Sequence, residues 1–276
     1  MLESFLQAVN SFTGLDLSYI FNGKHLAWYA SVRYTLFAAV FGAALALCFG
    51  VLGAAAKRSN FAPLRWFGSG YITMVRGIPD VLIILFFPLA FEQLVEYIFS
   101  FSQCTVEERT GGGWPPCAGA QWYLSTTEYL LMACVSLGIV YGAFAANVIY
   151  GAMRAVPREQ LEAARAFGFT SRQIFWRFHV RQMWAYALPG LSNVWMLLLK
   201  ATSFLSLLQI SDIVQWAGRL GAANYFPRAG LVHGDWRWKY YLALFLFYIL
   251  LTLISEKIFA YLQRRASKGM AIEQGG

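Results

Sequence analysis

The chain has 276 residues, of which 58% are hydrophobic and only 13% are charged. Soluble domains carry about 25% charged residues, so this composition, with a mean hydropathy of +0.50, excludes an ordinary soluble globular protein and indicates a polytopic membrane protein. The formal net charge of +8 does not indicate nucleic-acid binding. Basic residues gather at the cytoplasmic face of membrane proteins, and the sequence contains no nucleic-acid-binding module.

The first 26 residues differ from the rest of the chain. They hold scattered apolar residues together with Glu3, Asp16 and Lys24. A cleavable signal peptide has a basic stretch, an apolar stretch and a small-residue cleavage site in that order, and residues 1–26 lack this order. We therefore predict an extracytoplasmic or interfacial segment over residues 1–26.

Five apolar segments are each long enough to cross about 30 Å of hydrocarbon. They indicate an all-α integral membrane protein with about five transmembrane helices, a transmembrane domain over residues 27–262 and a cytoplasmic tail over residues 263–276. A further apolar stretch, 205–226, is broken by polar residues and glycines, so it is predicted to be re-entrant or to lie on the outer surface. The five segments are about Ala27–Ala56, Tyr71–Phe99, Thr127–Tyr150, Trp184–Leu208 and Trp238–Leu262.

Basic residues follow the first, third and fifth of these segments. Since an odd number of spans puts the two termini on opposite sides, the positive-inside rule predicts a cytoplasmic carboxyl terminus and an outer amino terminus. The loop that contains Cys104 and Cys117 then faces outward. In an oxidising compartment these two cysteines can form a disulfide. The sequence leaves both a disulfide and two free thiols open.

The loop over about residues 151–182 has a helical pattern of its own. Pro157 is suited to a helix start and Gly168 to a helix end, which predicts a helix of about three turns between them. Thr170 is a candidate N-cap for a second helix. The pattern fits either a docking element or an interfacial amphipathic helix. Residues that share one face of the first helix at three- and four-residue spacing are Leu161, Ala164, Arg165 and Gly168.

The stretch 76–80 reads Arg-Gly-Ile-Pro-Asp within the second apolar segment. Gly77 and Pro79 are predicted to break the helix, and Arg76 and Asp80 are spaced to pair along one helical face. This pattern favours a gating hinge on a translocation path. The alternative is a helix start whose charges reach the membrane surface.

Polar side chains inside apolar spans usually face a bundle interior or a cavity. Asn147, Asn193 and Lys200 fall in such spans, and Phe144 would lie on the same helical face as Asn147. The candidate substrate-pathway residues are Phe144, Asn147, Asn193, Lys200 and Ser203.

The sequence contains no set of residues for bond chemistry. The three histidines, His25, His179 and His233, are far apart and lack metal-ligand spacing. No phosphate-binding lysine loop and no Ser/His/Asp set is present. We expect no enzyme activity, no metal site and no cofactor on this chain, so ATP hydrolysis would need another polypeptide.

Glu162-Ala163-Ala164 followed by Gly168 resembles the EAA loop of ABC importer permeases, the coupling helix that sits in a cleft of the ATPase subunit. The surrounding chain is similar to the polar amino acid uptake branch, and most closely to the histidine/lysine-arginine-ornithine type permeases. The matching pieces occur in the family's order, from the second span to the segment after the fourth. They are 76–80, Tyr141-Gly142-Ala143-Phe144, Ala155-Val156-Pro157, 162–168, Ala187-Leu188-Pro189-Gly190 and Leu199-Lys200-Ala201-Thr202-Ser203.

The resemblance implies a type I ABC importer permease fold in a bacterial inner membrane, with a cytoplasmic coupling helix. It implies two ATPase subunits that hold ATP and Mg²⁺, a second identical or homologous permease, an extracytoplasmic substrate-binding protein and membrane lipid as partners. The implied cargo is a polar, first of all a basic, amino acid. The residues it assigns to ATPase coupling are Glu162, Ala163, Ala164, Arg165 and Gly168.

Two departures from the family pattern bear on mechanism and cargo. The proline that usually ends the EAA region is absent from Phe178–Arg181, and Asn147 stands where close relatives carry a glutamate. Since a carboxylate would suit a cationic side chain, Asn147 puts a basic cargo in doubt. The alternatives are a permease for another solute, such as an opine or an osmolyte, and an ATP-independent channel or sensor.

Overall fold

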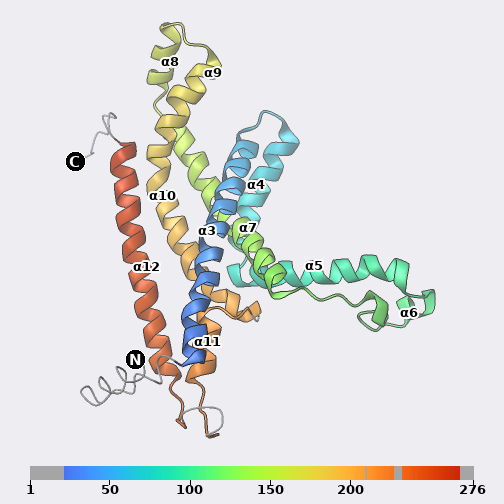
Figure 1. The fold of residues 1–276 in the computed structure, drawn as a ribbon. Helices are drawn as coiled ribbons and strands as arrows, with labels where there is room; N and C mark the ends of the chain where they lie inside the picture. Colours follow the sequence, from blue (N-terminus) through green and yellow to red (C-terminus); the bar gives the residue numbers. More distant parts are fainter. Residues whose placement is uncertain (1–21, 209, 227–231, 268–276) are drawn as a thin grey trace, which may run out of the picture. The chain divides into compact units, whose positions relative to one another are not determined.

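The computed structural model describes residues 22–208, 210–226 and 232–267 (Figure 1). Within these ranges the regular elements are helices, and the β-pairing is confined to an isolated bridge between Asn224 and His233. The prediction of an all-α protein is therefore confirmed. Most of the predicted amino-terminal segment (1–21) and the end of the predicted tail (268–276) lie outside the described residues.

Five helical segments are long and apolar enough to cross a membrane, as predicted. The fourth begins earlier than expected, because the helix of the fourth apolar segment continues without a break from Ser171. The segments are α3 (Gly23–Arg58), α5 (Asp80–Gln103), α7 (Thr126–Ala155), the continuous stretch Ser171–Leu208 and α12 (Arg237–Ala266). The shorter helices are α4 (Ala62–Gly77), α6 (Val106–Thr110), η1 (Ala118–Ala120), α8 (Arg158–Ala166) and α11 (Ile213–Gly221).

The second apolar segment differs from its prediction. It was expected to run from Tyr71 to Phe99, but the structure divides it into α4, which ends at Gly77, and α5, which begins at Asp80. The predicted break at Gly77 and Pro79 is present, and it separates two helices. Pro79 is the N-cap of α5, and the 24 residues of α5 alone give about 36 Å of helix, enough for one crossing.

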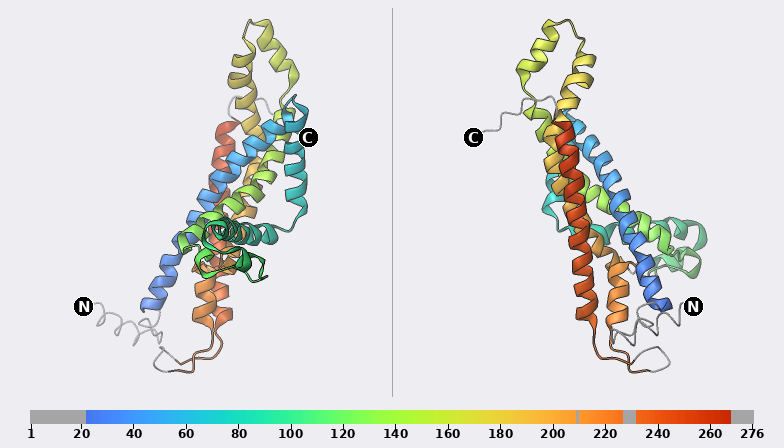
Figure 2. Two further views of the ribbon diagram at one scale, coloured as in Figure 1. Left: turned by 90° about the vertical axis from the view of Figure 1, so that its right-hand side faces the viewer. Right: turned by 60° about the vertical axis from the view of Figure 1, so that its left-hand side comes forward.

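The described residues form two compact units, 38–204 with 252–267, and 22–37 with 205–251 apart from the gaps at 209 and 227–231. In the larger unit, α7 contacts α4, α5 and the helix α10 (Val180–Ala201). Figure 2 shows α8 and α9 (Ser171–Gln173) as a hairpin at the end of this unit where α7 ends and α10 begins. α7 is therefore the central helix of the larger unit.

Helices α3 and α7 approach closely because glycines line their contact. A Cβ on Gly50 would lie 2.7 Å from the Cβ of Ala145, and a Cβ on Gly138 would lie 2.7 Å from the Cβ of Leu45. A Cβ on Gly142 would lie 2.7 Å from both the Phe49 Cβ and the Tyr71 hydroxyl. Small residues allow this backbone approach in lipid, where apolar burial between helices gives no driving force.

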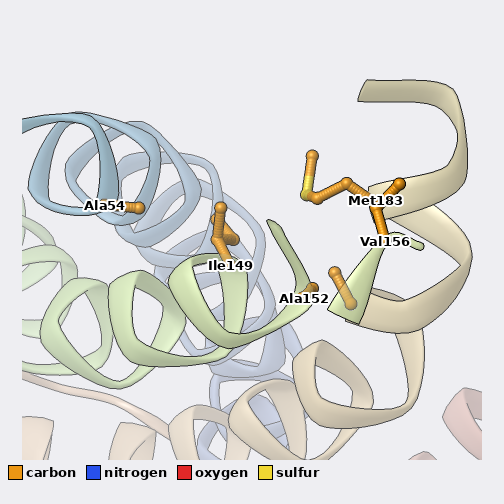
Figure 3. Packing of buried hydrophobic residues seen from close by; sticks show 6 residues of the cluster. Ala54, Ile149, Ala152, Val156 and Met183 are labelled. Atoms are coloured by element: carbon orange, nitrogen blue, oxygen red, sulfur yellow. The ribbon is translucent and has the colours of Figure 1, made fainter. Parts of the chain in front are cut away.

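A buried apolar cluster joins three spans next to the α8–α9 hairpin (Figure 3). Leu161 of α8 packs against this cluster from outside it. The cluster therefore links the hairpin to the ends of the spans. Its members are Ala54 of α3, Ile149 and Ala152 of α7, Val156 after it, and Met183 and Ala187 of α10.

The smaller unit holds the first residues of α3, the short helix α11 and the first part of α12. His25 Nε2 lies 2.8 Å from the Tyr240 hydroxyl, and Trp28 Nε1 donates to the Ile213 carbonyl at 3.0 Å. With nine residues, α11 is too short to cross a bilayer. The re-entrant or surface-lying placement of 205–226 stays a prediction.

Asp212 caps α11 and lies outside the five candidate spans. Its Oδ1 accepts the Gln215 backbone N–H at 2.8 Å, whereas its Oδ2 is buried without a hydrogen-bond partner. Burial raises the pKa of Asp212 to about 6, although the backbone N–H of Gln215 acts in the opposite direction. The folded state therefore disfavours the charged carboxylate.

The glycine contact between α3 and α7 predicts that Gly142→Ala destabilises the protein. The added methyl would force Phe49 or Tyr71 to move, with an expected loss of about 1–3 kcal/mol in the free energy of unfolding. Gly151→Ala is the matched control on α7, because a Cβ at Gly151 has nothing within 4 Å. Thermal unfolding in detergent compares the two variants. Equal melting temperatures would contradict the packing described here.

Because the N-cap carboxyl of α11 is buried, Asp212→Asn should increase the free energy of unfolding by an amount that depends on pH. Because the folded pKa of Asp212 is above the ordinary value of about 4, the wild-type free energy of unfolding should fall as the pH rises from about 4 to about 6. Asn keeps the N-cap without a charge, so the variant should be more stable above pH 7 by ~2–3 kcal/mol. The stability difference between variant and wild type, measured from pH 4 to 7.5, checks this. A pH-independent difference would contradict it.

Candidate functional site

The helix α8 runs from Arg158 to Ala166, with Pro157 as its N-cap. It is slightly shorter than the predicted three turns. Gly168 has a φ of +84°, a left-handed conformation that favours glycine at a helix end. Thr170 caps the following helix, since its hydroxyl accepts the Gln173 N–H and the Gln173 side chain accepts the Thr170 N–H at 2.9 Å. The predicted start, stop and cap are confirmed.

The four residues that were expected to share one face of α8 differ in their exposure to solvent. Ala164 is only 4% exposed and Leu161 packs against the buried cluster, so these two residues face the protein itself. Phe167, at the end of the helix, is 84% exposed. Leu161 and Ala164 are therefore turned toward the protein, whereas Arg165 and Gly168, expected on the same face, are exposed. The exposed residues between Arg158 and Gly168 are Arg158, Glu159, Gln160, Glu162, Ala163, Arg165, Ala166, Phe167 and Gly168.

The hairpin leads directly into the fourth span. After α9 the chain forms a π-helical segment, η2 (Ile174–His179), and continues as α10 without interruption. The family's proline is absent from this region, and a proline would remove a backbone donor and break such a helix. Phe169 and Phe178 pack edge to face with ring centroids 5.1 Å apart, which fixes the turn after α8 against the start of the span.

The helix break between α4 and α5 contacts α7. The Tyr141 hydroxyl donates to Asp80 Oδ2 at 2.8 Å. The rings of Tyr141 and Phe144 stack with centroids 6.0 Å apart, and the Arg76 guanidinium lies 5.4 Å from the Phe144 centroid. We call Arg76, Asp80, Tyr141 and Phe144 the break cluster.

The break cluster corrects one expectation. Arg76 and Asp80 were expected to pair along one helical face, but they belong to different helices. Within the described ranges the ion pairing is confined to Arg237 and Asp235. Arg76 instead contacts Phe144, a residue predicted to lie on the substrate pathway. The sequence did not indicate Tyr141 as the link to Asp80, because the two residues are 61 positions apart and their contact depends on how α5 and α7 pack.

The other predicted pathway residues lie apart from the break cluster. Asn147 is half-buried on the face of α7 that carries Phe144, whereas Asn193 and Lys200 are exposed on α10. In the part of the chain that is described, neither Asn193 nor Lys200 forms a hydrogen bond with α7. The Ser203 hydroxyl donates to the Lys200 carbonyl at 2.8 Å. The structure thus places Phe144 and Asn147 on one face of α7. It leaves the polar side chains of Asn193 and Lys200 exposed on the outer face of α10.

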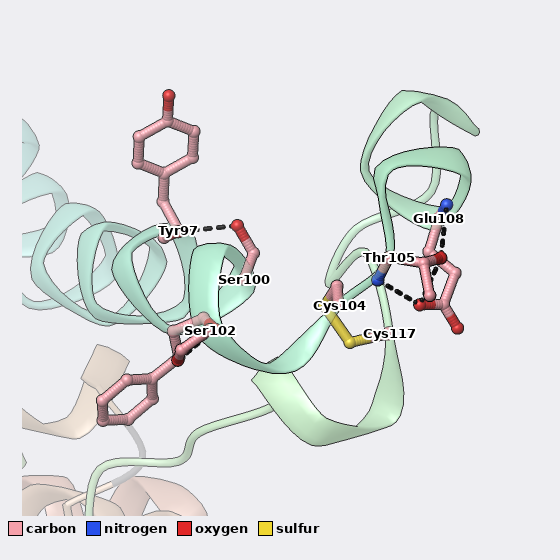
Figure 4. The surroundings of a disulfide bond; sticks show 8 residues. Tyr97, Ser100, Ser102, Cys104, Thr105, Glu108 and Cys117 are labelled. Atoms are coloured by element: carbon pink, nitrogen blue, oxygen red, sulfur yellow. Dashed lines mark hydrogen bonds between the residues drawn. A yellow bond between two sulfur atoms is a disulfide. The ribbon is translucent and has the colours of Figure 1, made fainter.

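The loop after α5 is closed by a disulfide between Cys104 and Cys117 (Figure 4). Thr105 caps α6 in a reciprocal arrangement with Glu108. Hydrogen bonds from the backbone N–H and then the hydroxyl of Thr105 lower the pKa of Glu108. Of the two options that the sequence left open, the structure has the disulfide. Cys104, Glu108 and Cys117 also lie close enough together to suggest a metal site, but both sulfurs are bonded to each other and are not thiolate ligands.

Two acidic residues on α5 were missed by the sequence interpretation. Glu96 is 6% exposed, and it accepts Trp114 Nε1 at 2.7 Å and the Trp122 N–H at 3.3 Å. One turn earlier, Glu92 accepts the Tyr129 hydroxyl at 2.5 Å. Two carboxylates four residues apart in an apolar span could have been recognised in the sequence as groups that need polar partners, because carboxylates are rare in membranes. They hold the disulfide loop and the start of α7 against α5.

Comparison with known proteins agrees with this architecture. The family model described as "Binding-protein-dependent transport system inner membrane component" matches residues 46–268. The histidine/lysine/arginine/ornithine transport system permease protein HisQ of Escherichia coli (strain K12) is 31% identical over 238 residues, which are 86% of this chain and 91% of that protein. The octopine transport system permease protein OccQ of Rhizobium radiobacter is 30% identical over 236 residues, 86% of this chain and 88% of that protein.

A solved structure described as an amino acid ABC transporter with histidines has a TM-score of 0.64 at 20% sequence identity, and the match covers 87% of this chain and 94% of that chain. This likeness confirms the predicted permease fold. Since the family model covers most of the chain, including four of the five spans in full, the chain belongs to the family of inner membrane components of binding-protein-dependent transport systems.

Proposed function

We propose that the chain is a permease subunit of an ATP-driven importer that carries a polar amino acid into the cytoplasm. The observation that carries this proposal is the exposed tip of α8, which combines charged side chains with an aromatic ring, Phe167, that is 84% exposed. A large exposed aromatic residue beside charges is typical of a protein interface. In this family the ligand for such a tip is the ATPase subunit.

The proposed orientation places the α8 end in the cytoplasm. Lys57, Arg58 and Arg154 lie at the ends of α3 and α7, on the same side as α8. Cytoplasmic ends carry the excess of basic residues. The disulfide loop after α5 then faces the oxidising side, where such bonds persist. The amino terminus would be outside and the carboxyl terminus inside.

The substrate pathway is proposed to pass the break cluster and Asn147. Arg76 and Asp80 offer opposite charges at a break between helices, where backbone groups are also available. An amino acid carries both a carboxylate and an ammonium group, so this pair complements its backbone. The names of the relatives also support an amino acid or an amino acid derivative as the cargo.

A second permease is proposed to cover the outer face of α10. Asn193 and Lys200 are seven residues apart and therefore share a face, and both are exposed. An amide and an ammonium are unfavourable against lipid tails, so this face requires a polar neighbour. The partner would be an identical or homologous permease, with an extracytoplasmic binding protein above the pair. ATP and Mg²⁺ would be held by two ATPase subunits, and this chain would contribute no catalytic group.

Phe167→Ser tests the coupling interface. If Phe167 inserts into the ATPase, its loss should weaken binding of the ATPase subunit to the permease by at least tenfold, as for a central aromatic contact. Phe226→Ser is the matched control, since Phe226 is 75% exposed and lies in the loop between α11 and α12. Binding is measured by titrating the ATPase subunit onto permease in lipid nanodiscs. Equal affinities for the wild type and both variants would refute α8 as the docking element.

Tyr141→Phe tests the role of the break cluster. The change removes the hydrogen bond to Asp80, and hydrogen bonds to charged groups contribute about 1.5–3 kcal/mol. We expect about a tenfold lower ratio of solute imported to ATP hydrolysed in proteoliposomes, because α7 would no longer move together with the break. Tyr129→Phe is the control, since it removes a similar bond to Glu92 on the same pair of helices. An equal loss of coupling in both variants would assign Tyr141 a purely structural role.

The cargo is identified by substrate-stimulated ATPase activity of the complete complex with its binding protein. Stimulation by basic amino acids would show that Asn147 does not exclude a cation. Stimulation by neutral or acidic amino acids would make Asn147 the first candidate for the altered selectivity. Octopine belongs in the screen, because the 30% identity to an octopine permease favours an opine as the second candidate. A response to none of these compounds would contradict the proposed cargo class.

A further inference from the structure

A groove on the larger unit has no role in the proposed transport path. It lies between the end of α3 with the following Ser59 and α4, from Leu64 to Tyr71, and has a volume of about 740 Å³. Ser59 and Tyr71 supply the only polar side-chain atoms among its lining residues. The Tyr71 hydroxyl donates to the Ile139 carbonyl at 2.7 Å, so it is already satisfied. The groove therefore offers an almost wholly apolar interior.

The length of the groove matches one leaflet of a bilayer. The ten residues from Phe49 to Arg58 span about 15 Å along α3, which is half of a hydrocarbon core of about 30 Å. The shallow end of the groove lies at the turn between α3 and α4, and the deep end at Tyr71 and Ile139. An extended hydrocarbon chain that enters from the membrane surface would fill this space.

The chain segment at the mouth of the groove is basic and contains no acidic residue. Lys57 and Arg58 end α3, Arg65 lies in the first turn of α4, and residues 57–75 contain no Asp or Glu. The cations of Lys57 and Arg58 lie over the rings of Tyr150 and Phe175. Arg65 is exposed and is one helical turn from Gly68, which lines the groove. Arg65 is thus placed to bind an anion at the mouth.

The outer surface of α4 fits the headgroup region of a membrane. Trp66 and Phe67 are 75% and 73% exposed, and aromatic residues of this kind gather where headgroups meet hydrocarbon. Basic pockets between membrane helices bind anionic lipid headgroups. A helix of a second permease would fill the apolar part of the groove but would leave the positive charge at its mouth without a counter-charge.

We propose that this groove binds one anionic phospholipid, with an acyl chain between α3 and α4 and the phosphate beside Arg65. The proposal concerns a lipid site on the permease itself and does not depend on the cargo or on ATP coupling. In this arrangement the lipid fills a space beside the glycine contact of α3 and α7, since Gly53, Phe49 and Tyr71 line the groove. Binding would therefore support the packing of α4 against these two spans.

Native mass spectrometry of the purified transporter complex tests the proposal directly. The probes are phosphatidylglycerol and phosphatidylcholine with identical acyl chains. The wild type should retain one phosphatidylglycerol per permease in preference to phosphatidylcholine. Arg65→Gln should reduce that preference about fivefold, the effect expected for one basic residue at the membrane surface. Arg33→Gln is the control, because Arg33 is exposed on α3, which also lines the groove, but lies in the half of that helix away from the groove.

A second variant tests the groove independently of charge. Ala55 is exposed and lines the groove, so Ala55→Trp should fill it and reduce retention of both lipids without disturbing the core. Unchanged phosphatidylglycerol retention in both Arg65→Gln and Ala55→Trp would overturn the proposal. High-yield crosslinking of Leu52→Cys to a second permease, in a Cys48→Ser background, would also overturn it, because the groove would then be a protein interface.

Discussion

The close approach of α3 and α7 is the constraint on which the larger unit depends. In lipid, burying apolar surface between two helices gives no hydrophobic driving force, so their association must come from direct packing of backbone and small side chains. Gly50, Gly138 and Gly142 permit that packing, with Cβ positions that neighbouring atoms already occupy. Once α3 and α7 are fixed, α4, α5 and α10 pack around α7, and the ends of these helices position the sites discussed above.

Hydrogen bonds between polar side chains fix how α5 and α7 align, which glycine packing does not determine for this pair. Two tyrosines of α7 donate to two acids of α5, Tyr141 to Asp80 and Tyr129 to Glu92. These bonds lie at the two ends of the contact between α5 and α7 and fix the register between the helices. Glu96 accepts hydrogen bonds from the Trp114 side chain and the Trp122 backbone N–H, both in the loop after α5. Both ends of α5 are thereby tied to the unit, although most of its apolar surface remains exposed.

The sequence was sufficient for much of this fold. The number of spans, the helix stop at Gly168 and the cap at Thr170 follow from local rules of composition and backbone geometry, and these predictions are confirmed. The inward direction of Ala164 and the contact of Arg76 with Phe144 could not be read locally, because both depend on how helices distant in sequence pack together. Glu92 and Glu96 were available as a signal, since carboxylates are rare in apolar spans, but their partners come from a loop without regular periodicity. The roles of the coupling and pathway residues stay predictions.

The buried side of α8 has a mechanical consequence. Leu161 packs on a cluster to which α3, α7 and α10 contribute, so the hairpin cannot move away from the spans without breaking this apolar contact. A displacement of the tip of α8 would therefore act on three spans at once through this contact. Weakening the contact between Leu161 and the cluster, more than changing the tip of α8, would make the connection between the hairpin and the spans flexible.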